Sequence, residues 1–166
     1  FYLCTNLSNL RFMSGSSLTT IGEYAFFCCR SLTKLVIPAG TVAIGKSAFD
    51  GDGALTSLTI PDSVTNIGDA AFSLGDLRSL TIPGDLDTRD WLFYSTLESV
   101  TFTGSKIIGQ PHHGANNSHV YADLPGRNAQ KVIISDSVKT IEAHAFCGCG
   151  KLTQVTMGDS VQAIGD

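Results

Sequence analysis

The chain has 166 residues, of which 15 are acidic and 11 are basic, so its formal net charge is −4; 43% of the residues are hydrophobic and 16% are charged. This apolar content is typical of a folded domain and argues against a disordered segment, and the acidic balance argues against a nucleic-acid-binding protein. No apolar run reaches the roughly 18 residues that a membrane-spanning helix needs. The chain begins at Phe1 without a signal-peptide pattern, so we expect it to be a piece of a longer protein.

A partial copy of a repeated unit opens the chain, and complete copies follow it. Six-residue segments that run from Ile to the pair Ala-Phe begin at Ile21, Ile44, Ile67 and Ile141, and a fifth begins at Ile164. Wherever two copies follow each other directly, they stand 23 residues apart. A period of about 20 to 50 residues indicates a solenoid, in which each coil buries its apolar side against its neighbours.

Between these segments runs a second block with the pattern Leu-x-x-Leu-x-Ile-Pro, at residues 32–38, 55–61 and 77–83. The alternation of apolar and other residues predicts a strand with one buried face, and the Pro ends the strand. Weaker copies lie at 97–102, 132–134 and 152–157, and residues 1–12 repeat the spacing of 26–37. We therefore predict one domain over 1–166, made of about seven 23-residue coils that are partial at both ends.

Two stretches depart from the repeat. The coil at 84–99 is short and irregular, and Trp91 is expected to fill its core. The second departure is a loop inserted at about 104–130, because 32 residues separate Val100 from Val132.

This inserted loop contains three histidines: His112, His113 and His119. Neutral imidazole binds Zn²⁺ and can act as a general base. Adjacent histidines, however, do not easily place both rings on one ion, and no acid or Cys recurs beside them. We therefore predict a solvated loop, with no metal site and no cofactor.

The combined pattern Leu-x-x-Leu-x-Ile-Pro-x-x-Val-x-x-Ile-Gly-x-x-Ala-Phe, with Cys three residues after the Phe, resembles the BspA-like (Treponema pallidum type) leucine-rich repeat. Residues 1 to about 83 and 131–166 carry the resemblance well, and 84–130 carry it in part. The resemblance implies an α/β repeat solenoid, a leucine-rich-repeat horseshoe with a parallel β-sheet on the concave side and short turns, 3-10 or helical segments on the other. It also implies a secreted or cell-surface protein that serves in adhesion or protein binding.

The five cysteines are interpreted through their place in the repeat. Cys4, Cys29 and Cys149 share one repeat position, which indicates a structural role. Adjacent coils lie about 4.8 Å apart, so a disulfide between Cys4 and Cys29 stays open, whereas Cys29 and Cys149 are several coils apart and cannot meet. We expect Cys28 and Cys147 to be the more reactive thiols.

Glycine follows the repeated Ile at Gly22, Gly45, Gly68 and Gly165. The 23-residue recurrence argues against a phosphate-binding loop, which needs one clustered Gly-rich turn. It predicts either a turn with positive φ or close packing of neighbouring coils.

If the strand Leu and Ile residues point inward, the residues between them form a row on the open face of the sheet. The row and its polar flank supply candidate ligand-binding residues: Lys34, Val36, Thr59, Thr81, Thr101, Ile133 and Thr156. The inserted loop supplies three more: His112, His113 and Tyr121.

We therefore expect a non-catalytic module that binds a protein or glycan ligand, extracellular by the resemblance, through the concave strand face. Two alternatives remain open. One is a structural spacer or stalk that displays another domain. The other is an enzyme that uses the histidine loop, although no nucleophile, acid pair or cofactor motif accompanies it and no catalytic residue is predicted.

Overall fold

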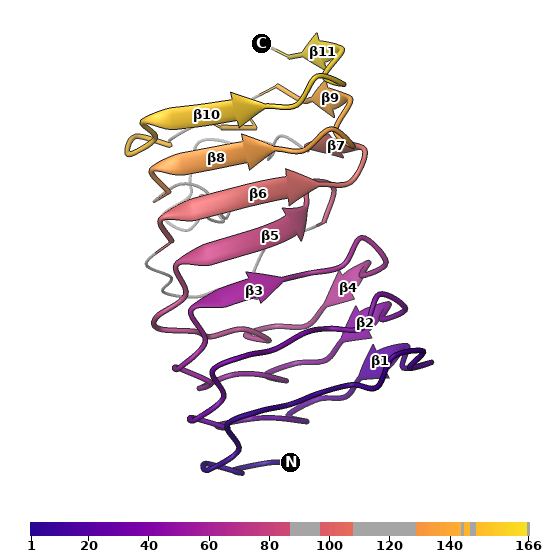
Figure 1. Ribbon diagram of the computed structural model, residues 1–166, viewed down its shortest axis with the longest axis vertical. Helices are drawn as coiled ribbons and strands as arrows, with labels where there is room; N and C mark the ends of the chain where they lie inside the picture. Colours follow the sequence, from indigo (N-terminus) through magenta and orange to yellow (C-terminus); the bar gives the residue numbers. More distant parts are fainter. Residues whose placement is uncertain (87–96, 108–128, 144, 147–148, 166) are drawn as a thin grey trace, which may run out of the picture.

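A computed structural model describes residues 1–86, 97–107, 129–143, 145–146 and 149–165. Figure 1 shows these residues as coils stacked along the long axis, with the two chain ends at opposite ends of the stack. Most of the irregular coil predicted at 84–99 and of the loop predicted at about 104–130, Trp91 and His119 included, lies outside the described residues. The number of coils stays a prediction.

One large parallel sheet forms the front of the stack. Its strands run in the order β10-β8-β6-β5-β3 and have these bounds: β3 Ser57–Thr59, β5 Ser79–Pro83, β6 Ser99–Thr103, β8 Lys131–Ile134 and β10 Gln154–Met157. An isolated parallel bridge between Asn9 and Lys34 extends the same pairing into the first coils. The predicted parallel strands are therefore confirmed.

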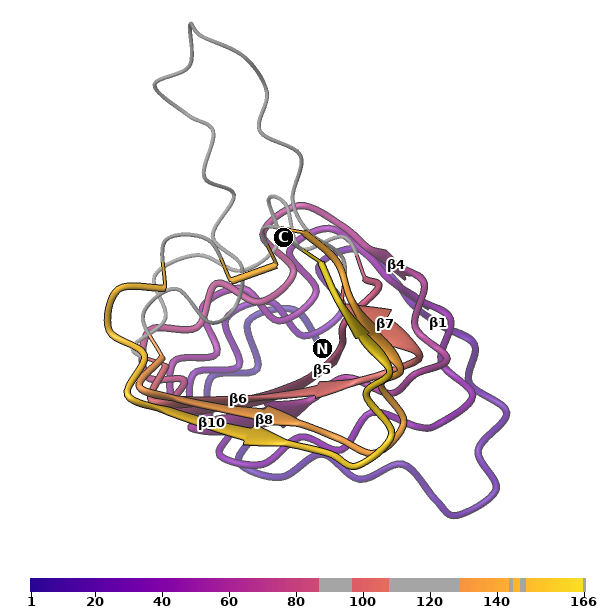
Figure 2. The same ribbon diagram turned by 90° about the horizontal axis from the view of Figure 1, so that it is seen from above.

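A second side of each coil carries shorter strands, also parallel. One three-stranded sheet contains β1 Thr20–Ile21, β2 Ala43–Ile44 and β4 Asn66–Ile67. Another contains β7 Lys106–Ile107, β9 Thr140–Ile141 and β11 Ala163–Ile164. Figure 2, a view along the stack, shows that these shorter strands form the side of the coils next to the large sheet.

The core lies between these sides and is built from the repeated apolar positions. Leu58, Leu80 and Val100 are at most 2% exposed, as are Ile60 and Ile82. The inward orientation predicted from the period-2 pattern is thus confirmed. The last coil packs on one neighbour only, which leaves two residues of β10 about half exposed: Val155 and Met157.

The repeated Phe residues form a continuous stack through the first coils. Ring centroids of Phe1 and Phe26, Phe26 and Phe49, and Phe49 and Phe72 lie 5.3, 5.2 and 5.3 Å apart, with planes within 6° of parallel. Such spacing is that of favourable ring contacts. The fixed spacing between coils therefore places the repeated Phe of one coil directly against the Phe of the next.

The expected helical or 3-10 segments are not found among the described residues, which form an all-β solenoid rather than an α/β one. Recurrent positive φ is the physical reason, with Tyr24, Ser47 and Ala70 at 54°, 50° and 54°. A residue in this left-handed region interrupts a right-handed helix. No helix of the described residues is long and apolar enough to cross a membrane.

Hydrogen bonds between coils take the place of the hydrogen bonds that the expected helical segments would have made. The Phe26 N–H donates to the Ala48 carbonyl at 2.8 Å, and the Phe49 N–H donates to the Ala71 carbonyl at 2.8 Å. The Cys28 N–H likewise donates to Asp50 in the next coil at 2.7 Å. Amides on this side are thus satisfied by the neighbouring coil.

Close coil packing, and not positive φ, explains three of the four glycines that follow the repeated Ile. None of the four has the positive φ seen at Gly15 and Gly51. A Cβ added at Gly45 would lie 2.5 Å from the Glu23 backbone nitrogen, and equally short contacts arise at Gly68 and Gly165. The close-packing alternative is therefore the correct one for Gly45, Gly68 and Gly165, whereas a Cβ at Gly22 would meet nothing within 4 Å.

Two substitutions on β3 test which side chains of the large sheet point into the core and which point to solvent. We expect Leu58→Asp to lower the free energy of unfolding by about 3–5 kcal/mol, because it buries an unpaired charge. Thr59→Asp, at the exposed neighbouring position, should change it by no more than about 0.5 kcal/mol. Urea unfolding followed by circular dichroism measures both, and similar losses for the two variants would contradict the assignment.

Two glycines at equivalent positions test the coil contact. We expect Gly45→Ala to destabilise the protein by about 1–3 kcal/mol, because the added methyl would overlap a backbone that cannot move aside. Gly22→Ala is the matched control: its Cβ would meet nothing within 4 Å, so its stability should stay near or slightly above that of the parent protein. Thermal unfolding of both compares them, and an equal loss would argue against the packing explanation.

Candidate functional site

The solvent-facing side of the large sheet, together with the coil segments that continue it toward the N-terminus, is called the strand face below. It carries two parallel rows of side chains. The central row contains Arg11, Val36, Thr59, Thr81, Thr101, Ile133 and Thr156. The flank row contains Asn9, Lys34, Ser57, Ser79, Ser99, Lys131 and Gln154.

Strand register brings these candidates together. Thr59 pairs with Thr81, Thr81 pairs with Thr101, and the central row continues in register through Ile133 to Thr156. The flank row is aligned in the same way, and the Ser99 hydroxyl donates to the Ser79 hydroxyl at 3.3 Å. Five candidate residues thus form one continuous line of neighbours.

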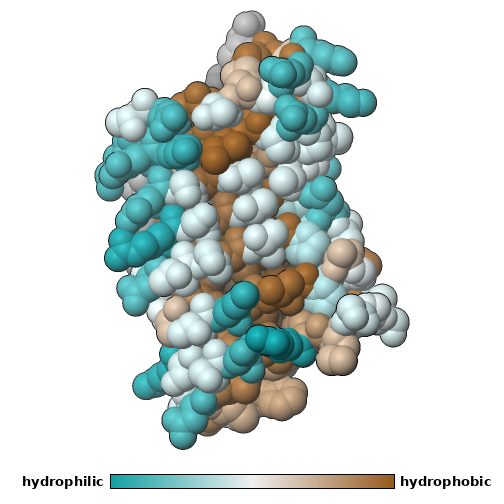
Figure 3. Space-filling model, viewed as in Figure 1, coloured by the Kyte–Doolittle hydropathy of each residue, from teal (hydrophilic) through white to brown (hydrophobic). Residues whose placement is uncertain are grey.

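Figure 3 shows the strand face directly: pale, weakly polar side chains cover its middle, and strongly hydrophilic and apolar side chains lie together at its lower end. Val36 is 61% exposed and Thr59 is exposed, whereas Thr81, Thr101 and Ile133 are half-buried. Short hydroxyl side chains lose little entropy when fixed and can both donate and accept hydrogen bonds. The face can therefore contact a polar ligand over a long distance.

A shallow pocket of about 240 Å³ lies at the N-terminal end of the strand face. Its lining combines residues of both rows with two apolar neighbours, Leu10 and Phe12: Asn9, Leu10, Arg11, Phe12, Lys34 and Val36. Lys34 and Val36 were candidates from the sequence. Asn9 and Arg11 lie in the same rows but were not candidates, because row membership does not reveal a hollow.

The predicted loop residues His112, His113 and Tyr121 lie outside the described residues. Within the described part of the chain, no group of three or more His, Cys, Asp or Glu side chains is placed to hold a metal ion.

Four cysteines are described: Cys4, Cys28, Cys29 and Cys149. Of these, Cys4, Cys28 and Cys29 are free thiols. Cys29 is fully buried and its thiol donates to the Phe1 carbonyl at 3.3 Å, so the structure has no bond between Cys29 and Cys4. Burial, followed by nearby Asp52, raises the pKa of the Cys29 thiol. Cys28 is half-buried, Cys147 lies outside the described residues, and the reactivity of both stays a prediction.

Asp52 is a feature that the sequence reasoning missed. It is fully buried, and neither carboxylate oxygen has a hydrogen-bond partner among the described residues. Burial raises the pKa of Asp52 to about 8; the nearby Cys29 backbone acts in the opposite direction, and Asp50 adds a smaller increase. Its repeat position was the available signal, because Asp52 stands 23 residues after Cys29, where the repeat otherwise places a small, poorly polar side chain.

Comparison with known proteins gives the family. The model of the BspA type leucine-rich repeat region matches residues 1–111 and 124–166 in six copies. This match covers most of the chain, so the chain belongs to the BspA-type leucine-rich repeat family, as the resemblance implied. No curated protein matches the chain closely enough to count as a relative.

Two solved structures are similar to the chain. One is a leucine-rich repeat protein from Bacteroides ovatus ATCC 8483, 21% identical, with a TM-score of 0.45, over 100% of this chain and 58% of that one. The other is a leucine rich cell surface protein from Faecalibacterium prausnitzii A2-165, 18% identical, with a TM-score of 0.31, over 84% of this chain and 57% of that one. The chain therefore spans just over half the length of each.

Replacing Asp52 tests its burial. The folded-state pKa of about 8 lies above the unfolded value of about 3.9, so Asp52 lowers stability progressively as the pH rises from about 4 to about 8. Asp52→Cys, which restores the residue type of Cys29, should gain stability over the parent by up to about 1.4 kcal/mol per pH unit in that window.

Urea unfolding at pH 4, 6 and 8 measures the difference between the two proteins. Asp76→Asn is the control, because it removes a carboxyl at an exposed position that does not contribute to the raised pKa of Asp52. A constant difference between Asp52→Cys and the parent at all three pH values would contradict a neutral, buried Asp52.

Proposed function

We propose that this member of the BspA-type leucine-rich repeat family is a non-catalytic binding module of a secreted or cell-surface protein, and that it binds a partner macromolecule through the strand face. The observation that carries the proposal is the in-register alignment of Thr59, Thr81, Thr101, Ile133 and Thr156 on one solvent-facing sheet.

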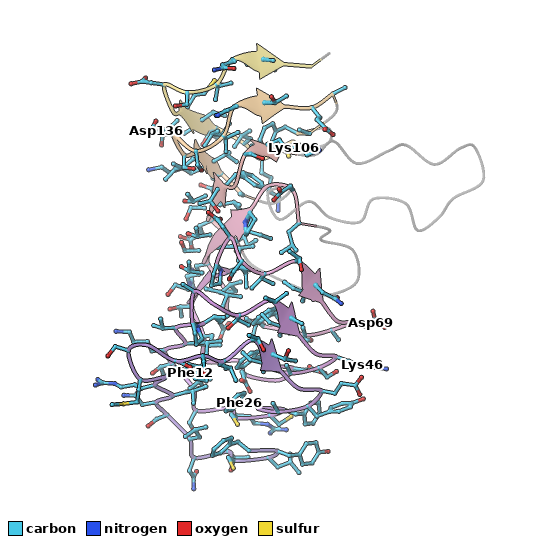
Figure 4. All side chains as sticks on the ribbon, turned by 90° about the vertical axis from the view of Figure 1, so that its right-hand side faces the viewer. Phe12, Phe26, Lys46, Asp69, Lys106 and Asp136 are labelled. Atoms are coloured by element: carbon cyan, nitrogen blue, oxygen red, sulfur yellow. The ribbon has the colours of Figure 1, made fainter. Side chains whose placement is uncertain are left out.

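The distribution of charged residues also favours the strand face as the binding surface. The two rows contain three cationic residues and no acid, although the whole chain has a formal charge of −4. Paired charges lie elsewhere: Arg78 contacts Glu98 beside the flank row, and Lys106 contacts Glu142 at 3.4 Å. Figure 4 shows Lys46 and Asp69 on the side of the molecule away from the strand face. Because the two rows of the strand face contain no acidic side chain, this face favours association with an acidic surface and disfavours basic partners.

The test is binding of the purified chain to a panel of extracellular-matrix proteins, mucins and glycans. The test variant is Thr59→Glu with Thr101→Glu, two positions separated by the strand β5, so that the new charges are not direct neighbours. We expect affinity for a bound panel member to fall at least tenfold, because two charges and added bulk enter the line of contact.

Thr20→Glu with Thr65→Glu is the matched control, because it adds the same charges at exposed positions outside the strand face. It should bind like the parent, and circular dichroism should show all variants folded. Equal affinity of the strand-face variant and the parent would contradict the proposed surface. Absence of any binding by the parent would favour the spacer alternative.

A further inference from the structure

The pocket at the N-terminal end of the strand face differs from the rest of that face in its charge. Two of its six lining residues, Arg11 and Lys34, are exposed cations. They come from consecutive coils, because the bridge between Asn9 and Lys34 holds those coils side by side. Figure 4 shows side chains that end in nitrogen projecting outward at the level of Phe12.

Neither cation is neutralised within the part of the chain that the structure describes. Among the described residues, Arg11 and Lys34 have no carboxylate within 4 Å, whereas Arg78 and Lys106 each have one. Two like charges on neighbouring coils repel each other, and a bound anion removes that repulsion. The planar guanidinium of Arg11 also presents paired donors that match a carboxylate.

The apolar lining restricts the ligand further. Val36 is 61% exposed, and Leu10 and Phe12 are only partly buried beside the cations. An inorganic anion would leave this apolar surface in water, whereas a ligand with an acidic group next to an apolar one would cover it. The Asn9 amide adds one neutral donor and acceptor.

A peptide satisfies these conditions better than a glycan does. The two rows contain no Phe, Tyr or Trp, and Phe12, the one aromatic residue of the pocket lining, is half-buried, so the face presents little aromatic surface. The hydroxyl side chains of both rows continue from the pocket along the stack and suit an extended chain. Acidic and aliphatic side chains next to each other are common in peptides.

We propose that this pocket binds an acidic side chain of an extended peptide segment in a partner protein, with an adjacent aliphatic side chain of that segment on Val36. This inference rests on the binding function proposed above and assigns its anchor point and the chemistry of its partner. The carboxylate lies between Arg11 and Lys34, and the rest of the segment follows the rows toward β3.

The probe is a fluorescein-labelled peptide of alternating Glu and Leu, followed by fluorescence anisotropy at low and moderate salt. We expect Arg11→Gln with Lys34→Gln to weaken binding at least tenfold. Added salt should weaken binding by the parent more than by this variant, because the variant has lost the screened interaction. Val36→Ser alone should weaken binding by a smaller factor.

Arg30→Gln with Lys46→Gln is the matched control, because it removes the same two residue types at exposed positions that do not line the pocket. It should bind like the parent. Equal affinity of the pocket variant and this control, or no binding of the peptide by the parent, would overturn the inference. A sulfated glycan that binds in an Arg11- and Lys34-dependent way while the peptide does not would overturn the assigned ligand class.

The strand-face variant separates the two proposals. If Thr59→Glu with Thr101→Glu abolishes binding of a panel protein while the pocket variant binds it normally, the face is functional and the pocket is not its anchor. If both variants bind normally, the proposed function fails together with the inference.

Discussion

Spacing between coils is the constraint on which the rest of this structure depends. Backbone hydrogen bonds between parallel segments hold equivalent atoms about 4.8 Å apart, so each residue packs chiefly against its counterparts one repeat before and after it. Under this constraint Phe26 and Phe49 stack with parallel rings, and Gly45 has no space for a Cβ. A substitution in one coil therefore changes the surroundings of the two coils that pack against it.

The same constraint determines what the surface can present. A row places the same repeat position of successive coils side by side, and identical charges in adjacent coils would repel each other at close range. Hydroxyl side chains avoid this cost, which accounts for the Thr and Ser residues in the middle of the strand face. The cations are confined to coils nearer its ends, where Arg11 and Lys34 flank the pocket and Lys131 is isolated among neutral neighbours.

Much of this arrangement could be predicted from the sequence, because a period of 23 and an alternation of two fix which residues share a row and which face the core. Leu58 and Thr59 follow that rule. The turn side could not be predicted, because a six-residue segment such as Ile21 to Phe26 is compatible with a helical turn or with bonds to the next coil. The pocket and Asp52 also escaped prediction, since the hollow depends on side-chain shape and the burial of one acid depends on its neighbours.

Asp52 has a consequence for the cooperativity of the stack. A solenoid unfolds as a chain of nearest-neighbour contacts, so one weak interface can divide it into parts that melt separately. Ionisation of the buried Asp52 carboxyl weakens the contacts on both sides of its coil. The coils that hold the pocket lie on the N-terminal side of this point. Their contact with the rest of the stack would therefore weaken as the pH rises toward 8.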